Sequence, residues 1–138
     1  MSPTQPSRIL THDAVMTMLS AAIAEAESHG QPQCIVIVDA SGELLGEIRM
    51  TGAKFLSRKS ARSKALTAAS IRAATTAIPD AVRHPIGMAT GGHMTGLPGG
   101  LPIMIEGECI GGIGIGSGSG DQDVAVATAA LKAIGADI

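Results

Sequence analysis

Residues 111–120 read GGIGIGSGSG, a glycine-rich run that decides much of the fold. Because side chains alternate across a β-strand, Gly112, Gly114 and Gly116 leave one face bare while the isoleucines between them cover the other. A glycine inside a strand costs about 0.5–1 kcal/mol relative to alanine, so its repetition indicates that the bare face is used. Something must therefore lie close against this face, and a packed helix, a second subunit or a flat ligand would each fit.

Two β-hairpins are predicted around this run. Residues 101–106 and 109–116 form one hairpin, because two apolar segments flank the turn sequence Glu106-Gly107-Glu108. Residues 34–38 are apolar and mostly β-branched, and residues 43–50 return as the second strand of another hairpin.

The second strand of the hairpin at 34–50 has two different sides. One side carries Leu44, Ile48 and Met50. The other side carries Glu43, Leu45, Glu47 and Arg49. The three charged residues of that side indicate a solvent-exposed face.

Three helices are predicted from apolar periodicity and helix propensity, over residues 11–29, 54–77 and 121–134. Thr11 is expected to cap the first helix and Gly30 to end it. Pro79 marks the end of the second helix. Asp121 is expected to cap the third, which Gly135 closes.

The helix predicted at 54–77 carries most of the candidate cationic residues. Lys54, Arg58 and Arg62 fall on one stripe at intervals of four residues, as expected for a solvated face. Lys64 projects in another direction. It could bind an anionic ligand, pair with Glu47, or extend its ammonium group to solvent.

Residues 85–101 are expected to form a glycine-rich loop, which is where a ligand site is often placed between rigid elements. His93 is the best single candidate for a functional side chain in this loop, since a histidine can bind a metal or move a proton near neutral pH. His84, next to Pro85, is a weaker candidate.

Length and composition bound the function. A chain of 138 residues fits one domain, predicted at 11–138 after a flexible tail at 1–10. The net charge of −2 and a single aromatic residue, Phe55, argue against a nucleic-acid partner. The absence of a signal-like segment or a long apolar run predicts a cytoplasmic protein with no membrane partner. A hydrophobic share of 45% predicts a homo-oligomer, because a small domain has little interior in which to bury it.

Several familiar motifs are absent or weak. The glycine spacing matches neither a dinucleotide fingerprint nor a phosphate-binding loop, and Asp121 and Asp123 would repel a phosphate at the following helix. The four histidines and two cysteines lack zinc-site spacing, so no metal site is predicted. Cys34 and Cys109 are interpreted as buried thiols. The Gly-x-Ser-x-Gly match around Ser117–Ser119 is weak in so repetitive a run.

Four separated motifs together resemble the GlcG/HbpS-like family of haem-binding and haem-degrading proteins, which is related to the PduO C-terminal domain. The first three are VDASGELL at 38–45, RMTGA at 49–53 and SARSKALTA at 60–68. The fourth is a group in the carboxyl-terminal half, made of PGGLPI at 98–103, GECIGGIGI at 107–115 and GDQD at 120–123. They cover nearly the whole chain from Thr11 onward.

The resemblance implies a profilin-like α/β (α+β) domain with an antiparallel five-stranded sheet flanked by helices. It also implies assembly into a symmetric oligomer, an octamer or a hexamer. Family members differ in function, so the fold alone does not assign one.

Two functional interpretations follow from the resemblance. The first is binding of haem or a related tetrapyrrole as the only expected cofactor, with His93 or Met94 as axial ligand and with Arg49, Arg62 or Lys64 meeting the propionates. Gly99 and Gly100 belong to the same expected cofactor site.

The second interpretation is an enzyme acting on a small anionic metabolite, such as a hydroxymuconate-like acid of a catabolic pathway, by hydrolysis or isomerisation. Arg49 and Lys64 would then hold carboxylates, and His93 or Glu47 would move the proton. A third possibility is an accessory protein without chemistry of its own.

Overall fold

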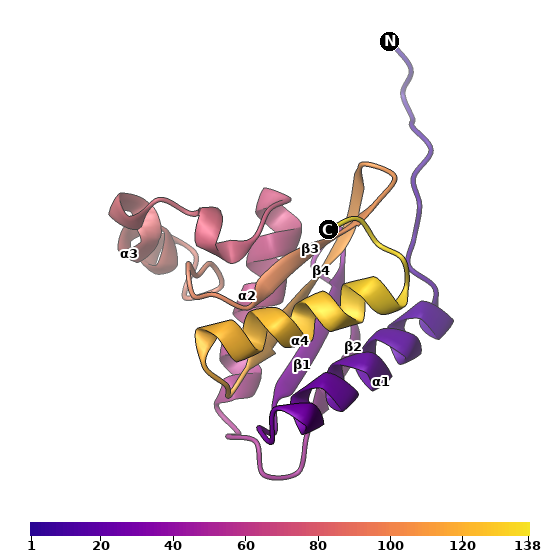
Figure 1. Ribbon diagram of the computed structural model, residues 1–138. Helices are drawn as coiled ribbons and strands as arrows, with labels where there is room; N and C mark the ends of the chain where they lie inside the picture. The colour runs from indigo at the N-terminus through magenta and orange to yellow at the C-terminus, as the bar shows by residue number, and fades with distance from the viewer.

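The computed structural model describes residues 1–138 and contains one antiparallel sheet flanked by helices (Figure 1). The strands are β1 (Cys34–Asp39), β2 (Leu44–Arg49), β3 (Gly100–Ile105) and β4 (Glu108–Gly116). Their order in the sheet is β2-β1-β4-β3, so the two predicted hairpins lie side by side. The α+β class and the antiparallel sheet are confirmed. The expectation of five strands is wrong, because the sheet has four and the two hairpins supply all of them.

The helices lie on both faces of this sheet. They are α1 (His12–Ser28), α2 (Ser57–Ile71), α3 (Asp80–Ala89) and α4 (Gly120–Ala133), with a short 3-10 helix, η1, at Thr75–Ala77. Figure 1 shows α1 and α4 together on one face, α2 on the other, and α3 away from the sheet. None of these helices has both the length and the apolar character that crossing a membrane requires.

The ends of α1 follow the sequence prediction, whereas the start of α4 does not. Thr11 caps α1 by accepting a hydrogen bond from the Ala14 amide at 3.1 Å. In α4 the cap is Ser119 and not Asp121. The Ser119 hydroxyl accepts from the Gln122 amide at 3.2 Å, and the Gln122 side chain accepts from the Ser119 amide at 2.9 Å. This reciprocal capping box satisfies two amides, which a single aspartate would not do.

The helix predicted at 54–77 is shorter than expected, and the predicted loop at 85–101 begins with helix. α2 ends at Ile71 because Arg72 adopts a left-handed conformation with φ 57°. Pro85 lies inside α3, which buries no residue. Glycine and proline content favoured a loop here, but propensity is a weak guide for so short a helix.

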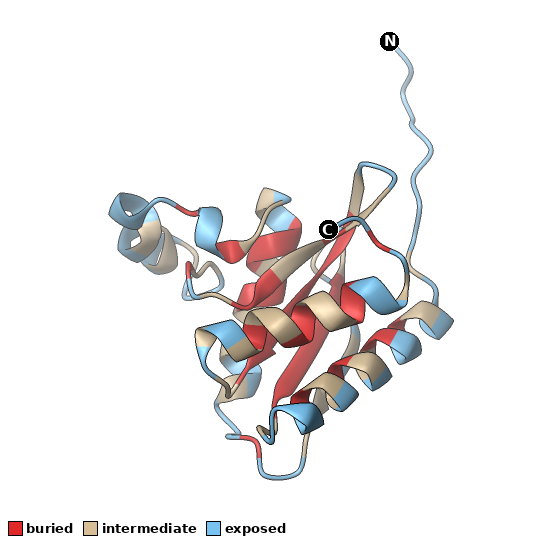
Figure 2. Cartoon of the chain, in the orientation of Figure 1, coloured by how far each residue is buried: buried red, intermediate tan, exposed pale blue.

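The core has two layers, one on each face of the sheet (Figure 2). In the larger layer, α1 and α4 pack against alternate residues of the strands. Its members include Met18 of α1, Ile35 and Ile113 of the strands, and Val126 and Leu131 of α4. Ile48 of β2 and Met50, directly after it, pack against this layer as predicted, whereas Leu44 is 47% exposed. The charged residues of the other side of β2 are exposed, as the sequence predicts.

The smaller layer explains the glycine run. It consists of Cys34, Val36 and Val38 of β1 against alanines of α2. A Cβ on Gly116 would lie 2.7 Å from the Ser57 carbonyl oxygen, and Cβ atoms on Gly112 and Gly114 would overlap the carbonyl oxygens of Ala65 and Ala61. Of the three possible neighbours of the bare face, the helix is the one present, and its backbone lies directly on the strand.

Candidate functional site

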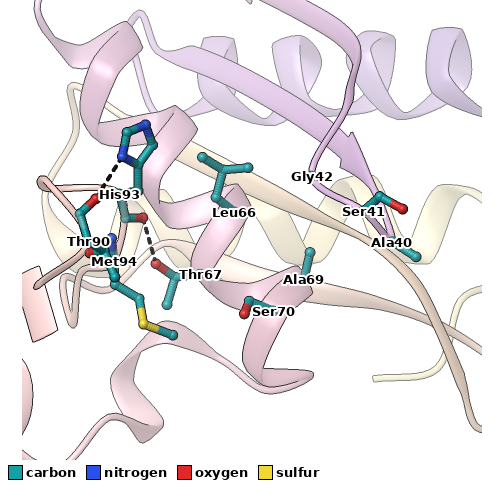
Figure 3. Close-up of a pocket in the computed structure, with 10 residues that line it drawn as sticks. All are labelled: Ala40, Ser41, Gly42, Leu66, Thr67, Ala69, Ser70, Thr90, His93 and Met94. Carbon is teal, nitrogen blue, oxygen red and sulfur yellow. Dashed lines mark hydrogen bonds between the residues drawn. The ribbon is translucent and has the colours of Figure 1, made fainter.

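His93 lies in the loop between α3 and β3, and its side chain is hydrogen-bonded to the backbone. Its Nδ1 is 2.8 Å from the Thr90 carbonyl oxygen (Figure 3). Because a carbonyl oxygen only accepts hydrogen bonds, Nδ1 donates in this contact, and the tautomer that makes it keeps a lone pair on Nε2. The imidazole is exposed, so this lone pair is available to a ligand.

Two side chains of α2 hold the loop that carries His93: Ser63, whose hydroxyl donates to the Gly92 carbonyl at 2.9 Å, and Thr67. The Thr67 hydroxyl donates to the His93 carbonyl at 3.3 Å and accepts from the Thr95 amide at 3.0 Å. Thr67 is buried in α2, so these hydrogen bonds hold the backbone at His93 and Thr95 against the helix.

An apolar cavity of about 320 Å³ opens on one side of His93. Leu66, Ala69, Met94 and Ala40 supply its apolar surface, and Figure 3 shows the residues that line it. The thioether of Met94 points away from the imidazole of His93 in this view. The two side chains therefore do not present their donor atoms to a common point.

A second cavity, of about 540 Å³, is also lined by His93 and has no hydrophobic residue in its lining. Its lining consists of Lys59, Arg62, Ser63, Gly91, Gly92 and His93, with no hydrophobic or acidic residue. Arg62 and His93 thus line the same cavity. Lys59 was missed, although its position one helical turn before Arg62 places both cations on the same side of α2.

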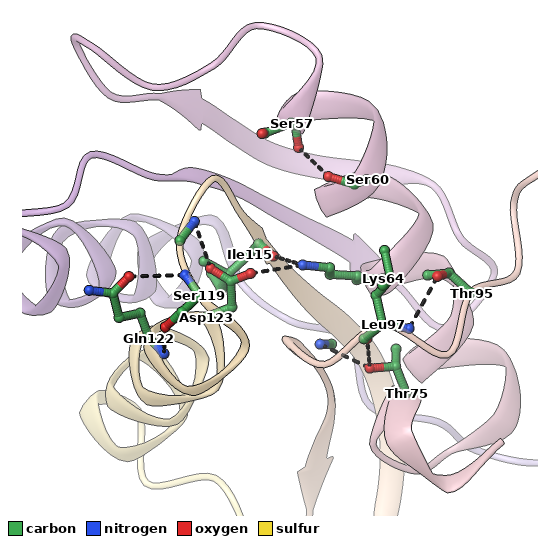
Figure 4. A network of polar contacts seen from close by, with 12 residues as sticks. Ser57, Ser60, Lys64, Thr75, Thr95, Leu97, Ile115, Ser119, Gln122 and Asp123 are labelled. Atoms are coloured by element: carbon green, nitrogen blue, oxygen red, sulfur yellow. Dashed lines mark hydrogen bonds and ion pairs between the residues drawn. The ribbon is translucent and has the colours of Figure 1, made fainter. Parts of the chain in front are cut away.

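Lys64, Gly99 and Gly100 are buried close to one another, away from the cavities at His93. Figure 4 shows Lys64 pointing from α2 toward Asp123. The Lys64 ammonium is 2.9 Å from an Asp123 carboxylate oxygen and donates to the Ile115 carbonyl at 2.7 Å. A Cβ on Gly99 would lie 2.7 Å from the Asp123 Cβ, and one on Gly100 would lie 2.5 Å from the Lys64 carbonyl oxygen. The proposed pairing of Lys64 with Glu47 is wrong, because its partner is Asp123.

Burial dominates the electrostatics of this pair. It raises the pKa of the Asp123 carboxyl above its usual range, and the hydrogen bond and positive charge of Lys64 offset part of that rise. The Lys64 and Asp123 side chains are 6% and 4% exposed. Lys64 is therefore not free to reach a propionate at the His93 cavities.

Arg49 and Glu47 lie on β2, apart from both places. Arg49 borders a cavity of about 510 Å³ near the end of α1, and Glu47 is exposed. The four residues expected to act together in an enzyme, which are His93, Lys64, Arg49 and Glu47, share no cavity.

The two cysteines are free and differ in burial. Cys34 is fully buried in β1, and burial raises the pKa of its thiol, with a smaller opposing effect from a hydrogen bond to Ser117. Cys109 is half-buried, so the prediction of two buried thiols is confirmed only for Cys34.

Comparison with known proteins gives concordant matches. The model of the family described as haem degrading protein HbpS-like matches residues 10–132. Protein GlcG of Escherichia coli (strain K12) is 30% identical over 107 residues, covering 77% of this chain and 80% of GlcG.

Two solved structures share the fold. The chain superposes on the Klebsiella pneumoniae protein ORFY with a TM-score of 0.93 and 26% identity, covering 100% of this chain and 99% of the other. It superposes on PduOC, solved as a haem complex, with a TM-score of 0.88 and 30% identity, covering 94% of this chain and 98% of the other.

Proposed function

The chain belongs to the family of HbpS-like haem-degrading proteins, and on that basis we propose that it binds haem or a closely related tetrapyrrole at His93. Membership alone does not identify a ligand, because one fold serves several functions. The proposal therefore depends on whether the residues around His93 suit such a ligand.

The observation that carries the proposal is the hydrogen bond from His93 Nδ1 to the Thr90 carbonyl. Histidines that bind metals commonly donate the other ring N–H to a backbone carbonyl, which fixes the ring and raises the basicity of the free nitrogen. Haem, when bound, supplies an iron that accepts a histidine nitrogen as an axial ligand. The Nε2 of His93 suits this role, because the side chain is exposed and its hydrogen bond to Thr90 uses only Nδ1.

The two cavities beside His93 match the two parts of a tetrapyrrole. Leu66, Ala69 and Met94 offer an apolar surface to the macrocycle in one cavity. Lys59 and Arg62 offer cations to carboxylate side chains in the other, and no acidic residue lines either cavity. We assign Met94 to the apolar wall, since its sulfur points away from the imidazole (Figure 3).

A haemin titration followed by absorbance tests the proposal. The wild-type protein should give a saturable Soret shift, and His93→Ala should abolish or displace it because the axial nitrogen is gone. His12→Ala is the matched control, since the His12 side chain is 93% exposed at the start of α1 and lines neither cavity. Albumin measures non-specific uptake.

The cationic cavity is tested separately. Replacing both Lys59 and Arg62 by glutamine should weaken haemin binding about tenfold without moving the Soret maximum, because exposed charges each contribute about 0.2–1 kcal/mol.

An unchanged spectrum and affinity in His93→Ala would refute the axial assignment, and non-saturating uptake by the wild type would refute haem binding itself.

We also propose that the chain works as a symmetric homo-oligomer. Several large apolar side chains are exposed in the isolated subunit, including Leu45, Phe55, Leu56 and Met88. Light scattering coupled to gel filtration should give a mass several times the 13.8 kDa of one chain. A monomeric mass at micromolar concentration would contradict this.

A further inference from the structure

A polar cavity of about 330 Å³ lies beside the Lys64–Asp123 pair, apart from the two cavities at His93. It is lined by Lys54, Ser57, Ser60, Lys64, Leu97, Pro98, Ser117, Gly118, Gly120 and Asp123. None of these residues lines the apolar or the cationic cavity at His93. From its chemistry we infer that it binds a small organic monocarboxylate that carries hydroxyl groups.

The Lys64 ammonium provides the first argument. An ammonium group has three N–H donors, and two of them are used by Ile115 and Asp123. The third has no partner in the protein, although the side chain is 6% exposed and lines the cavity. In many proteins, replacing a buried ion pair by apolar residues leaves the stability of the fold unchanged or raises it. A contribution to stability therefore does not by itself explain why the Lys64–Asp123 pair lies on the wall of a cavity.

The Gln33 side chain provides a second, independent argument. It is fully buried, and neither its amide oxygen nor its amide nitrogen has a hydrogen-bond partner. Its Nε2 lies close to Gly118, where an added Cβ would overlap it, and Gly118 is part of the cavity wall. An unsatisfied buried amide destabilises the folded state, because it has lost its hydrogen bonds to water and gained none in return. The polar groups of this corner are therefore incomplete without a ligand or ordered water.

Charge and size narrow the ligand. Lys54 and Lys64 against Asp123 leave the lining with one positive charge in excess, which suits a monoanion better than a doubly charged phosphate. Ser57, Ser60 and Ser117 add hydroxyl groups that can meet hydroxyls of the ligand (Figure 4 shows Ser57 and Ser60 on α2). The volume lies at the lower end of the range of about 300–1,000 Å³ for small-molecule sites, so the ligand has few carbons.

Calorimetric titration of the protein with glycerate tests this inference. Glycerate is a three-carbon carboxylate with two hydroxyl groups, and it should bind saturably with one molecule per chain. Propionate, which lacks the hydroxyls, and inorganic phosphate should both bind at least several-fold more weakly. Equal affinity for phosphate and glycerate would overturn the assignment to a monocarboxylate.

Variants locate the binding. Lys54→Gln should weaken glycerate about twofold to fivefold, as expected for one exposed charge, whereas Lys132→Gln on the exposed side of α4 should have no effect. The double variant Lys64→Met/Asp123→Leu keeps the interior free of unpaired charge and should lose detectable binding while retaining the wild-type circular dichroism spectrum. Binding that survives in this folded double variant, or no wild-type binding at millimolar glycerate, would refute the inference.

The site does not depend on the proposed haem site. His93→Ala should therefore bind glycerate with unchanged affinity, and loss of glycerate binding in that variant would contradict the separation of the two sites.

Discussion

Substitution of Gly114 by alanine should destabilise the protein by about 2 kcal/mol. An added Cβ would overlap the Ala61 carbonyl oxygen and lie 2.5 Å from the Ala65 amide nitrogen. Unstrained contacts between carbon and other heavy atoms need about 3.5 Å, so α2 would have to retreat by at least about 1 Å. The atoms in the way are backbone, and no side chain can rotate to make room.

The magnitude follows from two opposing effects. Overpacking of a core lowers the free energy of unfolding by about 1–3 kcal/mol. The upper end applies here, because a gap of about 1 Å between α2 and the sheet already removes a quarter to a half of the energy of each van der Waals contact along the helix. Removing a glycine from a strand returns about 0.5–1 kcal/mol. The net loss of about 2 kcal/mol corresponds to a Tm lower by about 8 °C for a chain of this size.

Urea denaturation followed by circular dichroism measures this loss, at two protein concentrations so that any contribution of oligomerisation is detected. Gly87→Ala is the matched control. Gly87 lies in α3, where a Cβ would have its nearest neighbour at an ordinary 3.5 Å, and alanine should leave stability unchanged or raise it by up to about 1 kcal/mol. A Gly114→Ala variant within about 0.5 kcal/mol of wild type would refute the account of helix α2 resting on the strand by its backbone.

Three further predictions concern helix capping, the thiols and the buried carboxyl. Thr11→Ala removes the side-chain cap of α1 and should cost about 1 kcal/mol in urea denaturation, whereas Thr17→Ala in the exposed middle of the helix should cost less than half of that. Iodoacetamide at pH 8 should modify Cys109 before Cys34 in the folded protein, because burial raises the pKa of the Cys34 thiol and blocks access; mass spectrometry that finds Cys34 modified first would contradict this. The raised pKa of Asp123 means that the folded state binds a proton at pH values where the unfolded carboxyl, near 3.8, has lost it. The Asp123 contribution to stability should therefore fall as pH rises through this interval, and the unfolding free energy of wild type minus that of Asp123→Asn should decrease from pH 3 upward; a difference that increases would show that the pKa is lowered.

The strands were predictable because their signals are local. The β-branched run at 34–38 and the alternation at 43–50 each identify a strand, and the turns between them limit the pairing to hairpins. The two hairpins predicted from the residues supply the four strands that the sheet contains. The expectation of five strands came from the family resemblance. The predicted end of α2 and the predicted loop in place of α3 were also wrong. Arg72 adopts a left-handed conformation and Pro85 lies inside a helix, and the helix propensities of these residues predict neither.

The candidate site was predictable in part. His93, Met94 and Arg62 do lie together, because the loop after α3 folds back onto α2. The partner of Lys64 was not predictable, since Asp123 is 59 residues away and reaches it only through the packing of α4 against the far side of the sheet. Asp123 was interpreted as repelling a ligand, whereas its carboxylate is committed to a lysine.

The contact between α2 and β4 also limits how the sequence can change. Most packing defects can be suppressed by a smaller side chain on the opposite element, but the atoms nearest to Gly112, Gly114 and Gly116 are peptide carbonyl oxygens, which every residue possesses. Reducing Ala61 or Ala65 to glycine would therefore leave the obstruction in place. Second-site suppressors of a substitution at these glycines should map to positions that change the path of α2, such as its entry after Lys54 or its end at Arg72, and not to the residues in contact.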